Sequence, residues 1–243
     1  MQNSLEKIRV SAVSYTNTKA FVYGITESDI LKKIDLSLDI PSECAQKLID
    51  NHADIGLVPV AALLNIPDYH ILGDYCIGAV GPVNSVFIFS HKPIEEVRTI
   101  RFDKQSRTSN NLAKVLLKNY WKQSPEHVED ESADAFVEIG DRTFGKKNQY
   151  PFVYDLAEEW IKFTGLPFAF AVWAANKPIP QDFVSEFNTA LKLGLDNRDK
   201  VIAELPKRDD FDFEKYLMHN LNFDLDADKR KALNLFLDYI KAL

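Results

Sequence analysis

The 243-residue sequence lacks the marks of several large protein classes. It has two cysteines, too few for a disulfide-rich secreted domain. Cys44 and Cys76 each lie in an apolar run, so we expect two buried, reduced thiols. No apolar run approaches the roughly 20 residues that span a bilayer, and residues 1–15 show no secretory signal pattern. We therefore expect a cytoplasmic protein with no membrane partner.

Positive charge is also scarce. The 29 Lys and Arg residues are outnumbered by 36 Asp and Glu residues, which gives a net charge of −7. A surface of this sign repels phosphate backbones, so we predict no nucleic-acid partner. The motifs GxGxxG and GxxxxGK[ST] are absent, and with them the usual signals for dinucleotide and nucleoside triphosphate binding. The five histidines do not pair at metal-ligand spacing. We predict neither a metal nor a cofactor.

Apolar strands and amphipathic helices alternate in the first sixty residues. Residues 7–13 and 54–59 are short apolar runs typical of buried strands. In residues 34–40, apolar and polar side chains alternate with the period of a strand. A helix is predicted to begin at Pro41, with Ser42 as its N-cap. This β-α-β-α-β order favours an α/β sheet covered by helices on both faces.

The same alternation continues to the C-terminal tail. The tail is expected to be helical, with a last helix capped by Asp226, and the apolar strand 167–173 is expected to return to the first unit. We predict a discontinuous first lobe, 1–86 plus 175–243, with a second lobe, 87–174, inserted into it. Further strands are predicted over 69–77, 85–90, 98–102 and 135–139, and helices over 106–121 and 155–162. Ligands in such arrangements bind between the lobes.

Polar turns follow several of these strands and are the densest signal in the chain. Asn17, after the first strand, can both donate and accept hydrogen bonds, and Ser85 lies where the chain changes lobe. Residues 106–109 (Ser-Arg-Thr-Ser) begin a helix, where unpaired N–H groups and the helix dipole favour an anion. The same residue types also shape turns and cap helices, so a purely local role is the alternative reading at each position.

A set of motifs resembles those of the MqnA family, the chorismate dehydratases of the futalosine pathway of menaquinone biosynthesis: SYTNTKA, PSECAQKLIDNHADIGLVPVAAL, GPVNSVFIFS, FDKQSRTSNNLAKVLL and DLAEEWIKFTGLPFAFAVWA. The resemblance runs from about Ile8 to Trp173. It implies a two-lobed α/β fold like that of type II periplasmic binding proteins, with a central interdomain cleft. It also implies that chorismate is converted to 3-[(1-carboxyvinyl)oxy]benzoate and water without a cofactor. Thr16 is a departure, since we expect Leu there in many relatives.

The resemblance suggests roles for the polar turns. Asn17 and Ser85 are the predicted catalytic residues, in contact with the reacting part of chorismate. Ser106, Thr108 and Ser109 are expected to hold a carboxylate. The other predicted substrate-binding residues are Ser14, Tyr15, Thr18, Val83, Asn84, Arg107 and Asp141. The motifs contain no obvious base, which leaves Asp141 or a carboxylate of the substrate as the proton acceptor.

Two other functions are consistent with these patterns. A cytosolic protein that binds or senses a small anion without catalysis would use the same fold, which mostly serves transport or sensing. An MqnD-like 1,4-dihydroxy-6-naphthoate synthase is the second alternative, although the SYTNT turn favours MqnA. Either a monomer or a homodimer is expected.

Overall fold

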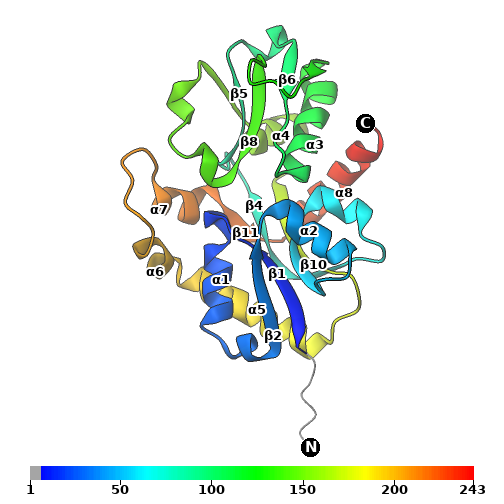
Figure 1. The fold of residues 1–243 in the computed structure, drawn as a ribbon, viewed down its shortest axis with the longest axis vertical. Coiled ribbons are helices and arrows are strands. Elements are labelled where there is room, and N and C mark those ends of the chain that lie inside the picture. The colour runs from blue at the N-terminus through cyan, green and yellow to red at the C-terminus, as the bar shows by residue number, and fades with distance from the viewer. Residues whose placement is uncertain (1–6) are drawn as a thin grey trace, which may run out of the picture.

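The computed structural model describes residues 7–243 and has two lobes, each built on its own β-sheet (Figure 1). The first six residues, on which the expectation of no secretory signal partly rests, lie outside the described residues. Over residues 7–243, no helix is both long and apolar enough to cross a membrane. Cys44 and Cys76 are buried free thiols, and burial raises the pKa of each to about 12.

The first lobe holds a six-stranded mixed sheet. Its strand order is β11-β4-β10-β3-β1-β2. The strands β1, β2 and β3 are parallel, whereas β10 is antiparallel to β3 and β4. The predicted parallel βαβ unit is thus confirmed, and it occupies half of the sheet. The bounds are Ile8–Val13 (β1), Ile34–Asp39 (β2), Ile55–Pro59 (β3), His70–Ala79 (β4), Phe168–Ala175 (β10) and Asn222–Asp224 (β11).

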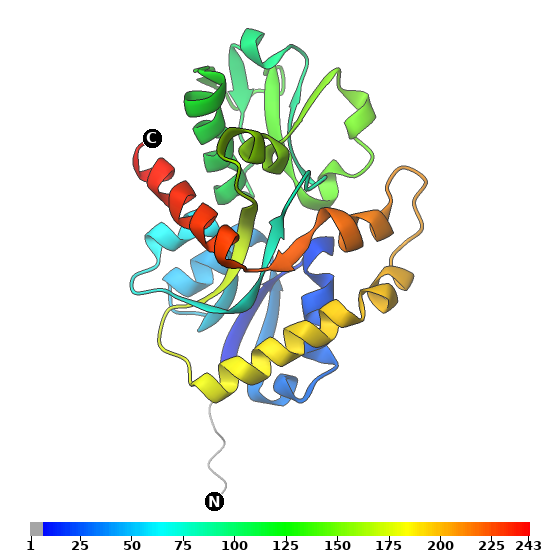
Figure 2. The ribbon, with the colours of Figure 1, turned by 180° about the vertical axis from the view of Figure 1, so that it is seen from behind.

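Helices cover both faces of this sheet. The strand order places β2 and β3 on opposite sides of β1, so right-handed crossovers put α1 (Lys19–Thr26) and α2 (Pro41–Ile49) on opposite faces. The long helix α5 (Gln181–Asp196) packs against α1 and crosses the back of the lobe (Figure 2). The N-cap of α2 is Ile40, not Ser42 as predicted, because Pro41 occupies the first helical position, where its missing N–H costs nothing.

The second lobe holds a five-stranded sheet of order β7-β6-β8-β5-β9. Its helix α3 (Arg107–Leu116) begins at the N-cap Ser106 and continues into a π-helical turn, Leu117–Trp121. Helix α4 (Leu156–Thr164) is capped by Asp155. The strands are Val86–Ser90 (β5), Thr99–Arg101 (β6), Glu126–His127 (β7), Ala135–Ile139 (β8) and Phe152–Asp155 (β9).

The chain crosses between the sheets twice, before β5 and before β10. The first crossing ends at Val86, one residue from the expected lobe boundary. The second comes before Phe168, earlier than the expected boundary at 174, because β10 pairs with β3 and β4 of the first lobe. By sheet membership, therefore, residues 168–174 belong to the first lobe, as the apolar strand pattern alone had suggested.

The C-terminal segment packs against both lobes. Helix α8 (Ala227–Lys241), capped as predicted by Asp226, runs from the first lobe along the side of the second (Figures 1 and 2). Its Phe236 ring lies 5.9 Å from the Trp160 ring of α4. Between α5 and α8 lie α6 (Arg198–Ala203), α7 (Phe213–Lys215) and a π-helical turn, Tyr216–Asn220.

Candidate functional site

A cavity lies between the two lobes. Its lining comes from the carboxyl ends of β1, β3 and β8, from β4, β5 and β10, and from the start of α3. A position between lobes is typical of ligand sites in α/β folds. The interlobe position agrees with the location predicted from the alternating strands.

Eight of the twelve predicted site residues line this cavity. They are Tyr15, Asn17, Thr18, Val83, Ser85, Ser106, Thr108 and Ser109. The other four are not among the lining residues, and each has a different setting. Ser14 is exposed and pairs through its backbone with Asp39, whereas Arg107 donates to Gln46. Asn84 and Asp141 are held by contacts described below.

The first polar turn brings Asn17 to the cavity wall. Residues Thr16–Thr18 form a 3₁₀ turn between β1 and α1, which directs Asn17 and Thr18 inward. The Thr18 hydroxyl donates to Asn17 Oδ1 over 3.0 Å. This arrangement leaves the Asn17 NH₂ group to donate elsewhere.

The first interlobe crossing is fixed by one buried carboxylate. Asp155 accepts hydrogen bonds from the N–H groups of Val83 (3.1 Å) and Asn84 (2.7 Å), and it also caps α4. Burial raises the pKa of Asp155 to about 6, against the opposing effect of these N–H donors. Asn84 adopts a left-handed conformation, with φ of 58°, which Asn tolerates better than most residues. Asn84 thus shapes the turn that presents Ser85 to the cavity.

The start of α3 forms a cradle of hydroxyl groups, which we define as Ser106, Thr108 and Ser109. Ser106 Oγ accepts from the Ser109 N–H over 3.0 Å, and Thr108 Oγ1 accepts from the Ala61 N–H of the first lobe over 3.1 Å. Because each of these two oxygens accepts a protein hydrogen bond, its own hydrogen is left to donate to a ligand. With the first N–H groups of the helix, the cradle can bind an anion.

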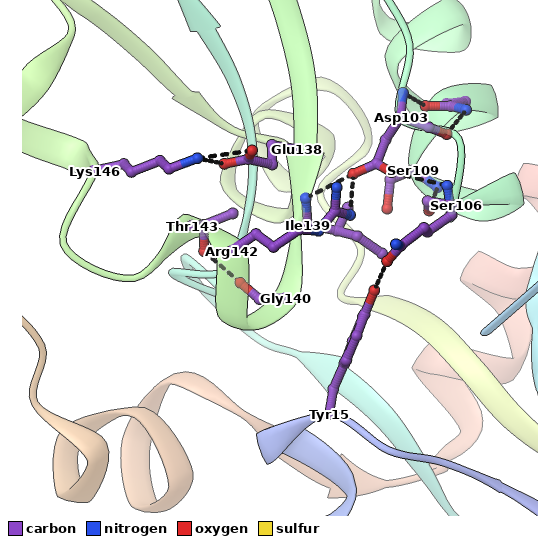
Figure 3. A network of polar contacts seen from close by, with 12 residues as sticks. Tyr15, Asp103, Ser106, Ser109, Glu138, Ile139, Gly140, Arg142, Thr143 and Lys146 are labelled. Carbon is purple, nitrogen blue, oxygen red and sulfur yellow. Dashed lines mark hydrogen bonds and ion pairs between the residues drawn. The ribbon is translucent and has the colours of Figure 1, made fainter. Parts of the chain in front are cut away.

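Behind the cradle, Asp103 organises the wall of the second lobe (Figure 3). Its buried carboxylate accepts from the Ile139 N–H (3.1 Å) and from the Arg142 guanidinium (2.6 Å). It also accepts from the Gln105 N–H over 2.9 Å. The charge of Arg142 is therefore paired behind the wall, so Arg142 does not supply a free cation to the cavity.

The hydrogen bonds that join the lobes include four near the cavity. Tyr15 donates to Gln105, Arg107 donates to Gln46, and the Ala61 N–H donates to Thr108 as described above. The fourth is Asp141, whose carboxylate accepts from the Thr16 N–H (3.1 Å) and the Thr16 hydroxyl (2.8 Å). Asp141 thus bridges the lobes, whereas the sequence had suggested a place in the cavity wall.

The cavity lining carries no ionised side chain among the described residues. An anion bound here would be held by hydroxyl, amide and backbone N–H donors inside a low-dielectric site, where such dipoles act strongly. Within residues 7–243 there is also no cluster of three or more His, Cys, Asp or Glu residues that could hold a metal ion.

Sequence reasoning missed the apolar floor of the cavity and the residue behind its polar wall. Leu57, Ile77 and Phe170 lie in apolar strands, where the pattern predicts only core packing. Tyr216 is fully buried, and its hydroxyl donates to Ser85 Oγ over 2.9 Å. No local signal identifies Tyr216, because the two residues are 131 positions apart in the chain.

The chain is similar to known proteins in both sequence and fold. Chorismate dehydratase of Thermus thermophilus is 27% identical over 232 residues, which cover 82% of this chain and 84% of that protein. The crystal structure of an Archaeoglobus fulgidus protein matches with a TM-score of 0.75 and 16% identity, over 97% of each chain. A Candida albicans protein described as having the generic periplasmic-binding-protein fold matches with a TM-score of 0.68 and 13% identity, over 98% of this chain and 91% of that one.

These likenesses confirm the predicted two-lobed, periplasmic-binding-protein-like fold and support the predicted family. A sequence family described as menaquinone biosynthesis matches residues 8–242, nearly the whole chain. The cavity between the lobes therefore lies in a protein that belongs to the menaquinone biosynthesis family.

Proposed function

We propose that this protein is a cofactor-free chorismate dehydratase, which converts chorismate to 3-[(1-carboxyvinyl)oxy]benzoate and water. The family and the Thermus thermophilus relative support the substrate. The observation that carries the proposal is the composition of the cavity wall. Asn17, Ser85 and the hydroxyl cradle of α3 line it with neutral polar groups, beside the apolar side chains of Leu57, Ile77 and Phe170. Such a cavity can hold a carboxylated ring in one orientation.

The reaction requires little beyond orientation and charge stabilisation. The proton on C3 of chorismate leaves, and its electron pair delocalises through the diene toward the ring carboxylate. The hydroxyl on C4 then departs and, with one proton, becomes water, so the ring becomes aromatic. The enzyme must hold the substrate carboxylates and stabilise the charge that develops, and preorganised neutral donors can do both.

We propose that a carboxylate of the substrate itself is the base that accepts the proton from C3. The cavity lining contains no Asp, Glu or His among the described residues. Asp141, the other candidate base, is not in the lining, and its carboxylate accepts two hydrogen bonds from Thr16. In this assignment, Asn17 and Ser85 form hydrogen bonds to the leaving hydroxyl and stabilise the charge that develops.

The test is incubation of the purified protein with chorismate, with and without a metal chelator, followed by product analysis. We expect the enolpyruvyl ether of 3-hydroxybenzoate to form well above the uncatalysed background in both samples. Binding with chorismate recovered unchanged would contradict the dehydratase and support an anion-binding protein. Loss of turnover on chelation would contradict a cofactor-free reaction.

The variant Ser85→Ala tests the role proposed for Ser85 directly. We expect kcat to fall by about 100-fold or more, the usual cost of removing one donor that stabilises developing charge. Ser90→Ala is the matched control, because Ser90 is a buried serine at the end of β5, the strand that follows Ser85, and lies outside the cavity lining. Equal turnover in the two variants would remove Ser85 from the site.

A further inference from the structure

Tyr216 lies directly behind the polar wall and touches both predicted catalytic residues. Its hydroxyl donates to Ser85 Oγ over 2.9 Å. The Asn17 side chain also hydrogen-bonds to the Tyr216 hydroxyl, a contact that lowers the pKa of Tyr216 against the effect of burial. Tyr216 is not itself in the cavity lining.

These contacts form a chain of hydrogen bonds through Tyr216. The Thr18 hydroxyl donates to Asn17 Oδ1, the Asn17 side chain hydrogen-bonds to the Tyr216 hydroxyl, and Tyr216 donates to Ser85 Oγ. Since Ser85 Oγ accepts from Tyr216, the hydroxyl hydrogen of Ser85 is left to point into the cavity. Burial raises the pKa of Tyr216 far above that of free tyrosine, so Tyr216 keeps its proton at neutral pH.

The surrounding structure holds Tyr216 in place. It is fully buried, and its ring packs edge-on against Phe144 of the second lobe (5.4 Å) and Phe211 of the C-terminal segment (5.3 Å). The backbone N–H of Tyr216 donates to the Asp212 carbonyl over 3.0 Å. A phenylalanine at this position would keep the ring contacts and lose only the hydroxyl.

We propose that Tyr216 is a positioning residue, which fixes the positions of the Asn17 and Ser85 side chains. Its hydrogen bond to Ser85 also makes the Ser85 hydroxyl a donor toward the hydroxyl that leaves the substrate. This inference rests on the proposed dehydratase function for the identity of the leaving group. The hydrogen-bond chain itself depends only on this protein's own residues. It connects the turn after β1, the first interlobe crossing and the C-terminal segment.

The first test is steady-state kinetics of Tyr216→Phe with chorismate. We expect kcat to fall about 10- to 100-fold, as for residues that orient a contacting group, with KM changed less than about threefold. In the double variant Tyr216→Phe/Ser85→Ala the two losses should not multiply, because part of the effect of Tyr216 passes through Ser85. Losses that multiply in the double variant, or a Tyr216→Phe enzyme with full turnover, would overturn the proposal.

Tyr154→Phe is the matched control. The Tyr154 hydroxyl accepts a hydrogen bond from the Ile94 N–H over 2.8 Å in the second lobe, away from the cavity lining. We expect this variant to retain wild-type kcat and KM. A fall in kcat equal to that of Tyr216→Phe would show that loss of any hydrogen-bonded tyrosine hydroxyl disturbs the enzyme, and would contradict a specific role.

A second measurement needs no turnover and separates this inference from the dehydratase proposal. In the substrate-free protein, proton NMR should show a slowly exchanging hydroxyl resonance that Tyr216→Phe removes. Ser85→Ala and Asn17→Ala should each shift this resonance. If the protein leaves chorismate unchanged but the resonance behaves as expected, the dehydratase proposal fails and the hydrogen-bond chain stands. A resonance that responds to neither variant overturns the chain.

Discussion

The Asp54 carboxylate connects three segments of the first lobe. It accepts from the Arg9 guanidinium over 2.7 Å and from the Arg9 backbone N–H over 2.9 Å, and it pairs with Lys177 over 2.7 Å. The Asp54 side chain is only 5% exposed. Burial disfavours its charge, but the hydrogen bonds from Arg9 and Lys177 outweigh that penalty and hold the pKa of Asp54 well below its usual value.

This shift predicts acid sensitivity of the fold. Because the pKa of Asp54 is lower in the folded state, its contribution is fully present above the unfolded value of about 4 and is lost as the pH falls below it. Asp54→Asn should lower the free energy of unfolding by about 2 kcal/mol at pH 7, since it removes the buried charge that accepts the hydrogen bonds from Arg9 and Lys177. Urea denaturation at pH 7, 5 and 3 measures both effects.

Asp29→Asn is the control for this prediction. Asp29 pairs with Lys32 on the surface, where both side chains are more than four-fifths exposed, so its loss should change the urea midpoint little. A variant Asp54→Asn that retains the pH dependence of the wild type would show that other carboxylates cause the acid sensitivity.

Helices α1 and α5 approach so closely that glycine is required where they meet. A Cβ atom built on Gly194 would lie 1.7 Å from the Ala20 carbonyl oxygen, and one on Gly24 would lie 2.0 Å from that of Ala190. Both obstacles are backbone atoms, which cannot move aside without separating the helices. This contact sets the spacing of the layer that covers the back of the first sheet.

Gly194→Ala should therefore destabilise the protein by about 2–3 kcal/mol, the upper range for overpacking a well-packed core. Gly81→Ala is the matched control, because no atom lies within 4 Å of a Cβ at that position. Thermal or urea denaturation of both variants measures the difference. Equal stability of the two variants would mean that α1 and α5 separate without cost.

The elements were largely predictable because their signals are local. The cap predicted at Asp226 and the helix start predicted at residues 106–109 depend on residues within a turn of them, and the structure confirms both. The wrong N-cap at Ser42 has a local reason too, since a proline one residue earlier already fits the first helical position. The glycine contact between α1 and α5 was not predictable, because within one helix a glycine indicates only a weaker helix.

The two lobes were predictable from the alternation of strands and helices, but several details of their assembly were not. The antiparallel partner of β3 is β10, which lies more than a hundred residues later in the chain. The lobe to which β10 belongs is therefore decided by its strand pairing and not by its sequence pattern. For the site, polar turns predicted eight lining residues. Tyr216 and the apolar floor depend on contacts across the whole chain, which local patterns do not carry. Asn17, Ser85 and the other assigned roles remain predictions.

Asp141 holds the lobes together at the edge of this site. Its carboxylate, from the second lobe, accepts hydrogen bonds from the Thr16 N–H and hydroxyl of the first, next to Asn17. The bond to the hydroxyl exists because the chain has Thr16 where we expected Leu in many relatives. Two hydrogen bonds to one charge favour the arrangement in which the lobes meet over the cavity.

Asp141→Asn should therefore shift the protein toward separated lobes. We expect KM for chorismate to rise about tenfold, the cost of one charge-assisted hydrogen bond, with a smaller change in kcat. Small-angle scattering should show a larger radius of gyration for the substrate-free variant than for the wild type. Glu138→Gln is the control, because Glu138 pairs with Lys146 at 2.8 Å inside the second lobe (Figure 3) and should alter neither quantity. If Asp141→Asn instead abolishes turnover with an unchanged radius and KM, then Asp141 acts in the chemistry and not in closing the lobes.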